Sequence, residues 1–104
     1  MIIVIVNHFV KPGRNDAAVQ RINTNGDRMA TLPGFLFRYL LVSDKDPQKI
    51  STVTGWEAAG DYDNWNVVKR ADEKGPMSPE ESPYERVVNE LHTVAQHDLA
   101  KLPA

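Results

Sequence analysis

The feature that most constrains the fold is a run of mainly β-branched residues near the start of the chain. Residues 2–10 read Ile-Ile-Val-Ile-Val-Asn-His-Phe-Val, which is the length of one strand. Hydrophobicity that is nearly continuous is expected when both faces of a strand are covered, so we predict a central strand here. The run is far below the ~20 apolar residues that span a bilayer, and it lacks a basic leader and a cleavage site. We therefore expect neither a membrane partner nor secretion.

Four further elements follow from periodicity and from Pro and Gly breaks. After Lys11-Pro12-Gly13, the sequence predicts a helix capped by Asn15 or Asp16, with apolar residues at helical spacing up to Met29. Strands are predicted at 35–42 and at 50–57, the second rich in β-branched residues. A second helix opens at Gly60-Asp61, with acidic residues in its first turn and basic residues towards its end, as the helix dipole favours.

The last third of the chain begins with a break in regular structure. Residues 74–83 hold three of the seven prolines and predict a loop. Residues 84–96 predict a fourth strand, although Leu91, Val94 and Ala95 would also permit a helix. The order βαββαβ indicates an α+β, ferredoxin-like fold, in which an antiparallel sheet has both helices on one face.

Composition excludes several classes of function. The 104 residues make one domain, 1–104, with residues 97–104 as a C-terminal tail. The 12 basic and 14 acidic residues give a net charge of −2, and the basic residues are scattered, so nucleic acid is not expected as a partner. There are no cysteines, which removes disulfides and thiolate chemistry and favours a cytoplasmic protein.

Several short motifs together resemble the antibiotic biosynthesis monooxygenase family. They are Asn7 on the first strand, Leu32-Pro-Gly-Phe35, Thr52-Val-Thr-Gly-Trp56-Glu57 and Tyr62-Asp-Asn-Trp65. The similarity runs from about residue 2 to about residue 70 and rests on the order and spacing of the motifs. It implies a homodimer whose sheets pack face to face, forming a dimeric α/β barrel, with a cleft in each protomer between sheet and helices.

The resemblance implies two kinds of chemistry. Some branches of the family oxidise quinols or polycyclic aromatic ketides without metal or cofactor, whereas the haem-degrading branch binds haem in the same cleft. That branch uses an Asn on strand one and a Trp on the second helix, which Asn7 and Trp65 match, and a His beyond that Trp. The third position falls at Lys74-Gly75-Pro76, and the histidines are His8, His92 and His97. Haem degradation is therefore disfavoured, and no cofactor is expected.

Each candidate residue also has a structural interpretation. Asn7 could orient a substrate or simply satisfy a neighbouring backbone group. Trp65 and Tyr62, which share one helix face, could wall the cleft or fill the core, and Trp56 is assigned to packing. By alternation, Phe9 would lie with Asn7 on the helix side of the sheet and contact the substrate.

Two polar residues are placed by strand alternation. Arg38 either holds negative charge in the cleft or points outward, and the outward orientation is favoured because arginine is rarely buried unpaired. His8 is next to Asn7 in the sequence, so it would project to the opposite face of the sheet, towards the dimer interface. A metal site formed by His8 and His92 is disfavoured because the ligand set is incomplete.

These observations favour a monooxygenase, without a dedicated metal, acting on a small quinol or other phenolic substrate. Asn7 and Trp65 would be catalytic, and Tyr62, Arg38 and Phe9 would bind the substrate. The alternatives are a haem-binding or haem-degrading enzyme and a non-catalytic module that binds a small ligand, because a fold does not by itself define a function.

Overall fold

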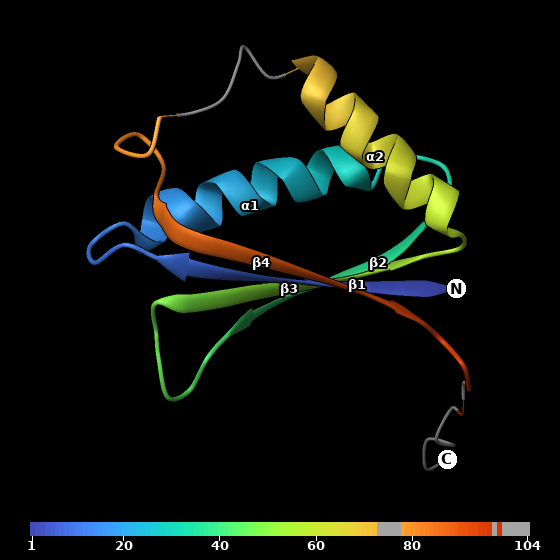
Figure 1. The fold of residues 1–104 in the computed structure, drawn as a ribbon, viewed down its shortest axis with the longest axis horizontal. Coiled ribbons are helices and arrows are strands. Elements are labelled where there is room, and N and C mark those ends of the chain that lie inside the picture. Colours follow the sequence, from blue (N-terminus) through green and yellow to red (C-terminus); the bar gives the residue numbers. More distant parts are fainter. Residues whose placement is uncertain (73–77, 97, 99–104) are drawn as a thin grey trace.

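The computed structural model describes residues 1–72, 78–96 and 98. The elements follow one another as predicted: β1 (Ile2–Val10), α1 (Asn15–Met29), β2 (Phe35–Val42), β3 (Lys49–Trp56), α2 (Ala59–Asp72) and β4 (Tyr84–Thr93). The strands form one antiparallel sheet in the order β2-β3-β1-β4, and both helices lie on the same face of it (Figure 1). The predicted ferredoxin-like α+β fold is therefore confirmed.

The predicted loop and tail are only partly described. Residues 78–83 contain neither helix nor strand, as expected for the Pro-rich segment. Residues 73–77, 97 and 99–104 lie outside the described residues, and with them the position at Lys74-Gly75-Pro76 and His97. Within the described part of the chain, neither helix is long and apolar enough to span a membrane.

Strand β1 is central, as its sequence predicts, but its two faces are exchanged relative to the prediction. Ile2, Val4, His8 and Val10 are buried on the side of the helices. Successive side chains of a strand point to opposite faces, so Asn7 and the other odd-numbered residues lie on the helix-free side. We call that side, with the residues paired to them on the other strands, the open face.

Two groups of buried side chains hold the helices to the sheet. Under α2, Trp56 is completely buried and packs with Tyr62 and Trp65 against β1. Under α1, Ala18 and Ile22 pack against Val10 of β1 and against β3. The two groups lie under different helices, and the space between sheet and helices is left partly unfilled.

The helix starts differ from one another. The predicted cap of α1 by Asn15 or Asp16 is wrong, because Arg14 occupies the cap position and makes no capping side-chain hydrogen bond. The amide of Asn15 instead donates to the carbonyl of Pro47, at 2.9 Å, and so ties the helix to the β2–β3 turn. At α2, the carboxylate of Asp61 accepts a hydrogen bond from the backbone N–H of Ala58, at 3.1 Å, which satisfies one of the free N–H groups of that helix end.

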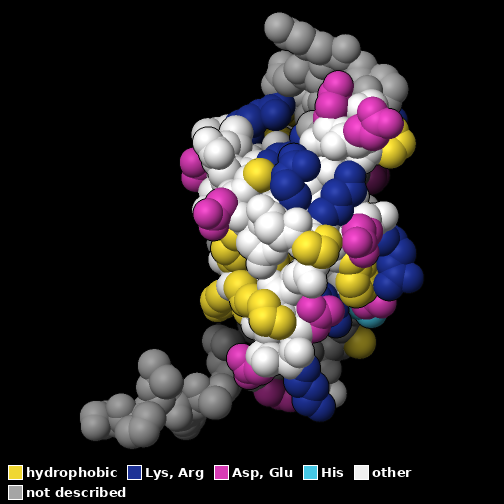
Figure 2. Space-filling model, turned by 90° about the vertical axis from the view of Figure 1, so that its left-hand side faces the viewer, with side chains coloured by type: hydrophobic (Ala, Val, Ile, Leu, Met, Phe, Trp, Pro, Cys, Tyr) yellow, Lys and Arg dark blue, Asp and Glu magenta, His cyan; other side chains and the backbone are white. Residues whose placement is uncertain are grey.

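The open face is largely apolar. Strand pairing places Ile3, Ile5, Phe9, Phe37, Tyr39, Leu41, Val53 and Val88 on it. Tyr39 is 60% exposed and Leu41 is 48% exposed. Figure 2, a view of one end of the molecule, shows hydrophobic side chains in several small groups among charges of both signs. An apolar sheet face of this kind, uncovered by any described element, is typical of a contact surface.

Candidate functional site: a cleft between sheet and helices

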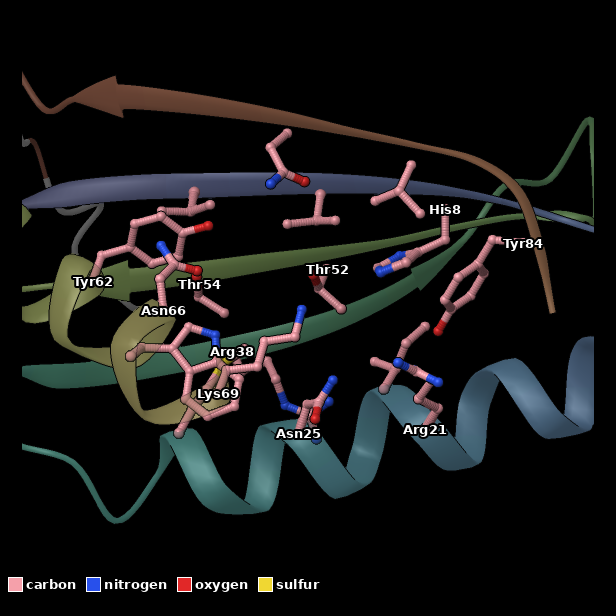
Figure 3. Close-up of a pocket in the computed structure, with 17 residues that line it drawn as sticks. His8, Arg21, Asn25, Arg38, Thr52, Thr54, Tyr62, Asn66, Lys69 and Tyr84 are labelled. Atoms are coloured by element: carbon pink, nitrogen blue, oxygen red, sulfur yellow. The ribbon is translucent and has the colours of Figure 1, made fainter. Parts of the chain in front are cut away.

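A cavity of about 290 Å³ opens between the helix-side face of the sheet and the two helices. Figure 3 shows its labelled side chains converging from both helices and from all four strands. Its walls are made by Val4, Val6, His8, Arg21, Ile22, Asn25, Met29, Arg38, Thr52, Thr54, Tyr62, Trp65, Asn66, Lys69, Tyr84, Val87 and Asn89. Ligand pockets typically have volumes of about 300–1,000 Å³, so this cleft suits a small molecule.

The aromatic wall of the cleft comes from α2. Trp65 and Tyr62 lie one turn apart, are 2% and 7% exposed, and both line the cavity. They also belong to the core around Trp56, whose ring centroid is 5.9 Å from that of Tyr62. Trp65 and Tyr62 therefore both pack in the core and line the cavity, and their role in binding a substrate stays a prediction. Trp56 lies outside the cavity lining, as its assignment to packing predicts.

His8 is the most informative polar residue of the cleft, and its predicted position was wrong. It is 9% exposed and lines the cavity on the helix side. Its Nδ1 lies 3.0 Å from the carbonyl oxygen of Ile50. A carbonyl can only accept a hydrogen bond, so Nδ1 carries the proton and Nε2 keeps its lone pair. Within the described part of the chain no group bonds to Nε2, which is free to accept a proton.

The surroundings of His8 keep the imidazole neutral. Burial is the main cause that lowers the pKa of His8; the hydrogen bond to Ile50 acts in the opposite direction, and the positive charge of Lys69 lowers the pKa further. Neutral imidazole is the form that acts as a base or as a metal ligand.

Tyr84, at the start of β4, packs beside His8. Their ring centroids are 5.0 Å apart, with the planes tilted by 42°. Burial raises the pKa of Tyr84, and the charge of Arg21 partly offsets that effect, so the hydroxyl stays protonated and can donate a hydrogen bond. Sequence reasoning did not select this residue, because only strand pairing brings residue 84 next to β1.

Arg38 faces the cleft, so the favoured outward orientation was wrong. Arg38 pairs with Thr54, which is buried on the helix side, and a register shift between Phe35 and Phe37 sets this phase. The guanidinium crosses to α1, where its Nη1 donates to the side-chain oxygen of Asn23 at 3.2 Å. Strict alternation does not anticipate the irregularity at Leu36 that turns Arg38 inward.

Asn7 and Phe9 do not reach the cleft, so their predicted place beside Trp65 was wrong. Both lie on the open face, because the even-numbered residues of β1 occupy the helix side. The Oδ1 of Asn7 accepts a hydrogen bond from the hydroxyl of Ser51, at 2.7 Å. The guanidinium of Arg86 lies 4.2 Å from the ring centroid of Phe9.

Metal binding finds no support among the described residues. No group of three or more His, Cys, Asp or Glu side chains comes together there. His92 pairs with Ile3 and so lies on the open face, whereas His8 lies in the cleft. The two histidines therefore do not form one site.

A family model and solved structures place the chain among known proteins. The model for antibiotic biosynthesis monooxygenases matches residues 1–67. No curated protein sequence matches.

Solved structures share the fold at low sequence identity. A crystal structure of an antibiotic biosynthesis monooxygenase matches with a TM-score of 0.74 and 18% identity, over 92% of this chain and 100% of the other. The heme-degrader MhuD from Mycobacterium tuberculosis, with two hemes bound in its active site, gives 0.73 and 20%, over 96% and 100%. A variant of SnoaB, a cofactor-independent oxygenase from Streptomyces nogalater, gives 0.70 and 15%, over 92% and 95%.

Proposed function

Because the chain belongs to the antibiotic biosynthesis monooxygenase family, we propose that it oxygenates a small, electron-rich hydroxyarene in its cleft, without a dedicated metal. The observation that carries this proposal is the state of His8. Its Nδ1–H is held by the Ile50 carbonyl, and its Nε2 presents a lone pair to an aromatic-lined cavity. A neutral imidazole held in one tautomer is suited to accept the hydroxyl proton of a substrate.

His8 would start the reaction by removing that proton. The resulting phenolate is electron-rich and reacts with dioxygen at the ring carbon opposite its oxygen. One oxygen atom stays on that carbon, and the other leaves as water with the hydroxyl hydrogen and the displaced ring hydrogen. The products are a quinone and water, so no external reductant is needed.

The rest of the cleft would bind and stabilise the phenolate. Trp65 and Tyr62 offer a flat apolar wall for an aromatic ring. Lys69 is close enough to His8 to lower its pKa, so it is also placed to stabilise negative charge that develops there. In this proposal His8 takes the polar role on β1 that was assigned to Asn7.

Oxygen uptake with a panel of naphthols, anthrones and quinols tests the proposal. We expect His8→Gln, which keeps a hydrogen-bonding side chain but removes the base, to lower kcat/KM by about 10²–10⁴. The wild-type rate should fall as pH decreases below the ordinary histidine value of 6.5, because Nε2 becomes protonated. Ligand binding without oxygen uptake across the whole panel would instead support the non-catalytic module.

Haem binding is a second candidate, which the position of His8 now favours. A histidine that donates Nδ1–H to a carbonyl and presents Nε2 is suited to ligate iron. Arg38 and Lys69 are available for the propionates, and bound haem would supply the oxygen-activating iron. Size argues against this candidate, because a cleft of about 290 Å³ lies at the small end of ligand pockets and a porphyrin would have to widen it.

Haemin titration separates the two candidates. Under the oxygenase proposal we expect a weak Soret shift that does not reach one haem per chain. Tight stoichiometric binding that His8→Ala abolishes, followed by loss of the Soret band with ascorbate and air in the presence of catalase, would make haem degradation the function.

We also propose that two copies pair through the open face. Ile5, Phe37 and Tyr39 belong to an apolar surface that no described element of the chain covers. Ile2, Val4 and Val6 of β1 face the helices and do not contribute to this surface. The apolar surface is formed by the alternate residues instead.

A further inference from the structure

Each charged side chain among the described residues that line the cleft is positive. Arg21 projects into it from α1, Arg38 from β2 and Lys69 from α2 (Figure 3). The described lining contains no Asp or Glu, although the whole chain has a net charge of −2. The charges of Arg38 and Lys69, which come from two separate elements, create a positive potential in the cavity that attracts and retains an anion.

Arg38 is held in a defined place, and no described acidic side chain neutralises its charge. Its guanidinium lies against Gly26 in the last turn of α1, where a Cβ atom would collide with it. Its Nη1 donates a hydrogen bond to the side-chain oxygen of Asn23, which carries no charge. Neither Arg38 nor Lys69 forms an ion pair with a described residue. A guanidinium has five N–H donors, so most of them remain available to a ligand.

We infer that the natural substrate carries a carboxylate on its aromatic ring system. The Arg38 guanidinium, which occupies the space that Gly26 leaves beside α1, would bind this carboxylate. This inference rests on the proposed function and names the substrate class for that site. Figure 3 shows Arg38 and Lys69 near the α2 end of the cleft and His8 towards Tyr84. A substrate held at its carboxylate would therefore extend its rings along the cleft and present a hydroxyl to His8.

The glycine at position 26 also supports this inference. Glycine inside a helix weakens it relative to alanine. Gly26 is buried in α1 and has an ordinary helical conformation without a positive φ, so its backbone does not require glycine. The close approach of the Arg38 guanidinium is the contact that a side chain at this position would disturb, because the guanidinium would have to move away. Fork-like pairing of a guanidinium with a carboxylate is a strong and directional interaction that would justify such a placement.

Binding of a matched ligand pair tests the inference. Naphthalene-2-carboxylate and naphthalene-2-carboxamide have nearly the same shape and no hydroxyl, so their binding does not depend on turnover. Their dissociation constants would be measured by quenching of tryptophan fluorescence and checked by calorimetry. We expect the carboxylate to bind about tenfold more tightly or better, as expected for a hydrogen-bonded charge pair.

Three variants assign this preference to Arg38. In Arg38→Gln the ratio of the carboxamide dissociation constant to the carboxylate dissociation constant should fall nearly to one. Arg38→Lys should keep only part of the wild-type ratio. Gly26→Ala should also reduce the preference for the carboxylate, because the new methyl group displaces the guanidinium. Alanine stabilises a helix relative to glycine, so α1 itself should remain folded. Arg70→Gln is the control, since Arg70 is exposed on α2 outside the cleft and its loss changes the net charge by the same amount. Circular dichroism confirms that each variant is folded.

The outcomes separate this inference from the proposed oxygenase. A wild-type preference near one, or a preference that survives Arg38→Gln, overturns the carboxylate site even when oxygen uptake is observed. A clear preference that Arg38→Gln abolishes, with no oxygen uptake by 1-hydroxynaphthalene-2-carboxylate or the rest of the panel, supports the carboxylate site and counts against the oxygenase.

Discussion

At the scale of single residues, His8 links the stability of the protein to pH. Burial of the imidazole lowers its pKa in the folded state. The unfolded chain therefore binds a proton more readily than the folded chain below the ordinary value of 6.5. The free energy of unfolding should be independent of this group above that pH and should decrease as the pH falls below it.

Urea denaturation between pH 8 and pH 5.5 measures this effect. We expect the midpoint to fall at the acid end in the wild type and to fall less in His8→Phe. His92→Phe is the matched control, because the His92 side chain is 56% exposed and lies on the open face. A wild-type curve that changes no more than that of His8→Phe would show that His8 is not responsible.

The residues of the cleft could be predicted only where the sequence distinguishes the two faces of a helix or strand. Trp65 and Tyr62 were found because their spacing puts two large aromatic side chains on one side of a helix. On β1 both sets of alternate residues are apolar, so hydrophobicity cannot decide whether Asn7 or His8 faces the helices. Tyr84 becomes adjacent to His8 only through the pairing of β1 with β4, which the local sequence does not encode.

At the scale of elements, the turn between α1 and β2 fixes the start of α2. Gly34 has a φ of +83°, and a Cβ atom there would collide with the carboxylate of Asp61. The carbonyl of Gly34 also accepts the backbone N–H of Glu57 at 2.8 Å, which joins the turn to the end of β3. Gly34 is therefore constrained both by its conformation and by its neighbour.

Gly34→Ala should be clearly destabilising. Placing a side chain at such a positive φ costs about 1–2 kcal/mol, and displacing Asp61 from its hydrogen bond to the N–H of Ala58 adds to this. Gly13→Ala is the control, because Gly13 has a φ of +75° but no atoms near its would-be Cβ. Thermal denaturation that ranks Gly13→Ala as equal to or worse than Gly34→Ala would contradict the contact with Asp61.

The elements themselves were largely predictable from periodicity. The bounds of β1 and β2 were predicted to the residue, and β3 was shifted by only one residue, because strands rich in β-branched residues stand out beside Pro and Gly breaks. Details that depend on partners distant in sequence were not predictable. Asn15 turned to Pro47 instead of capping its own helix, and β4 ended at Thr93 instead of continuing to residue 96.

At the scale of the whole molecule, the proposed pairing of two copies through the open face can be tested by substitution. Leu41 is 48% exposed on that face, and Leu41→Lys places a charge where two apolar sheets would meet. We expect light scattering to give a dimer mass for the wild type at micromolar concentration and a monomer mass for Leu41→Lys. Val67→Lys is the control, because Val67 is 61% exposed on α2, away from the sheet, and its replacement should leave the dimer intact. A wild-type monomer would refute the assembly.

The position of β4 connects assembly with the cleft. Among the described strands it lies at the edge of the sheet and pairs with β1 alone, and its side chains are mostly exposed. Alternate residues serve the two surfaces, since Val87 and Asn89 line the cleft whereas Arg86 and Val88 lie on the open face. A second copy on the open face would steady this edge, and with it the wall that contains Tyr84. Ligand affinity should then weaken on dilution, and by thermodynamic reciprocity a bound ligand should hold the two copies together more tightly.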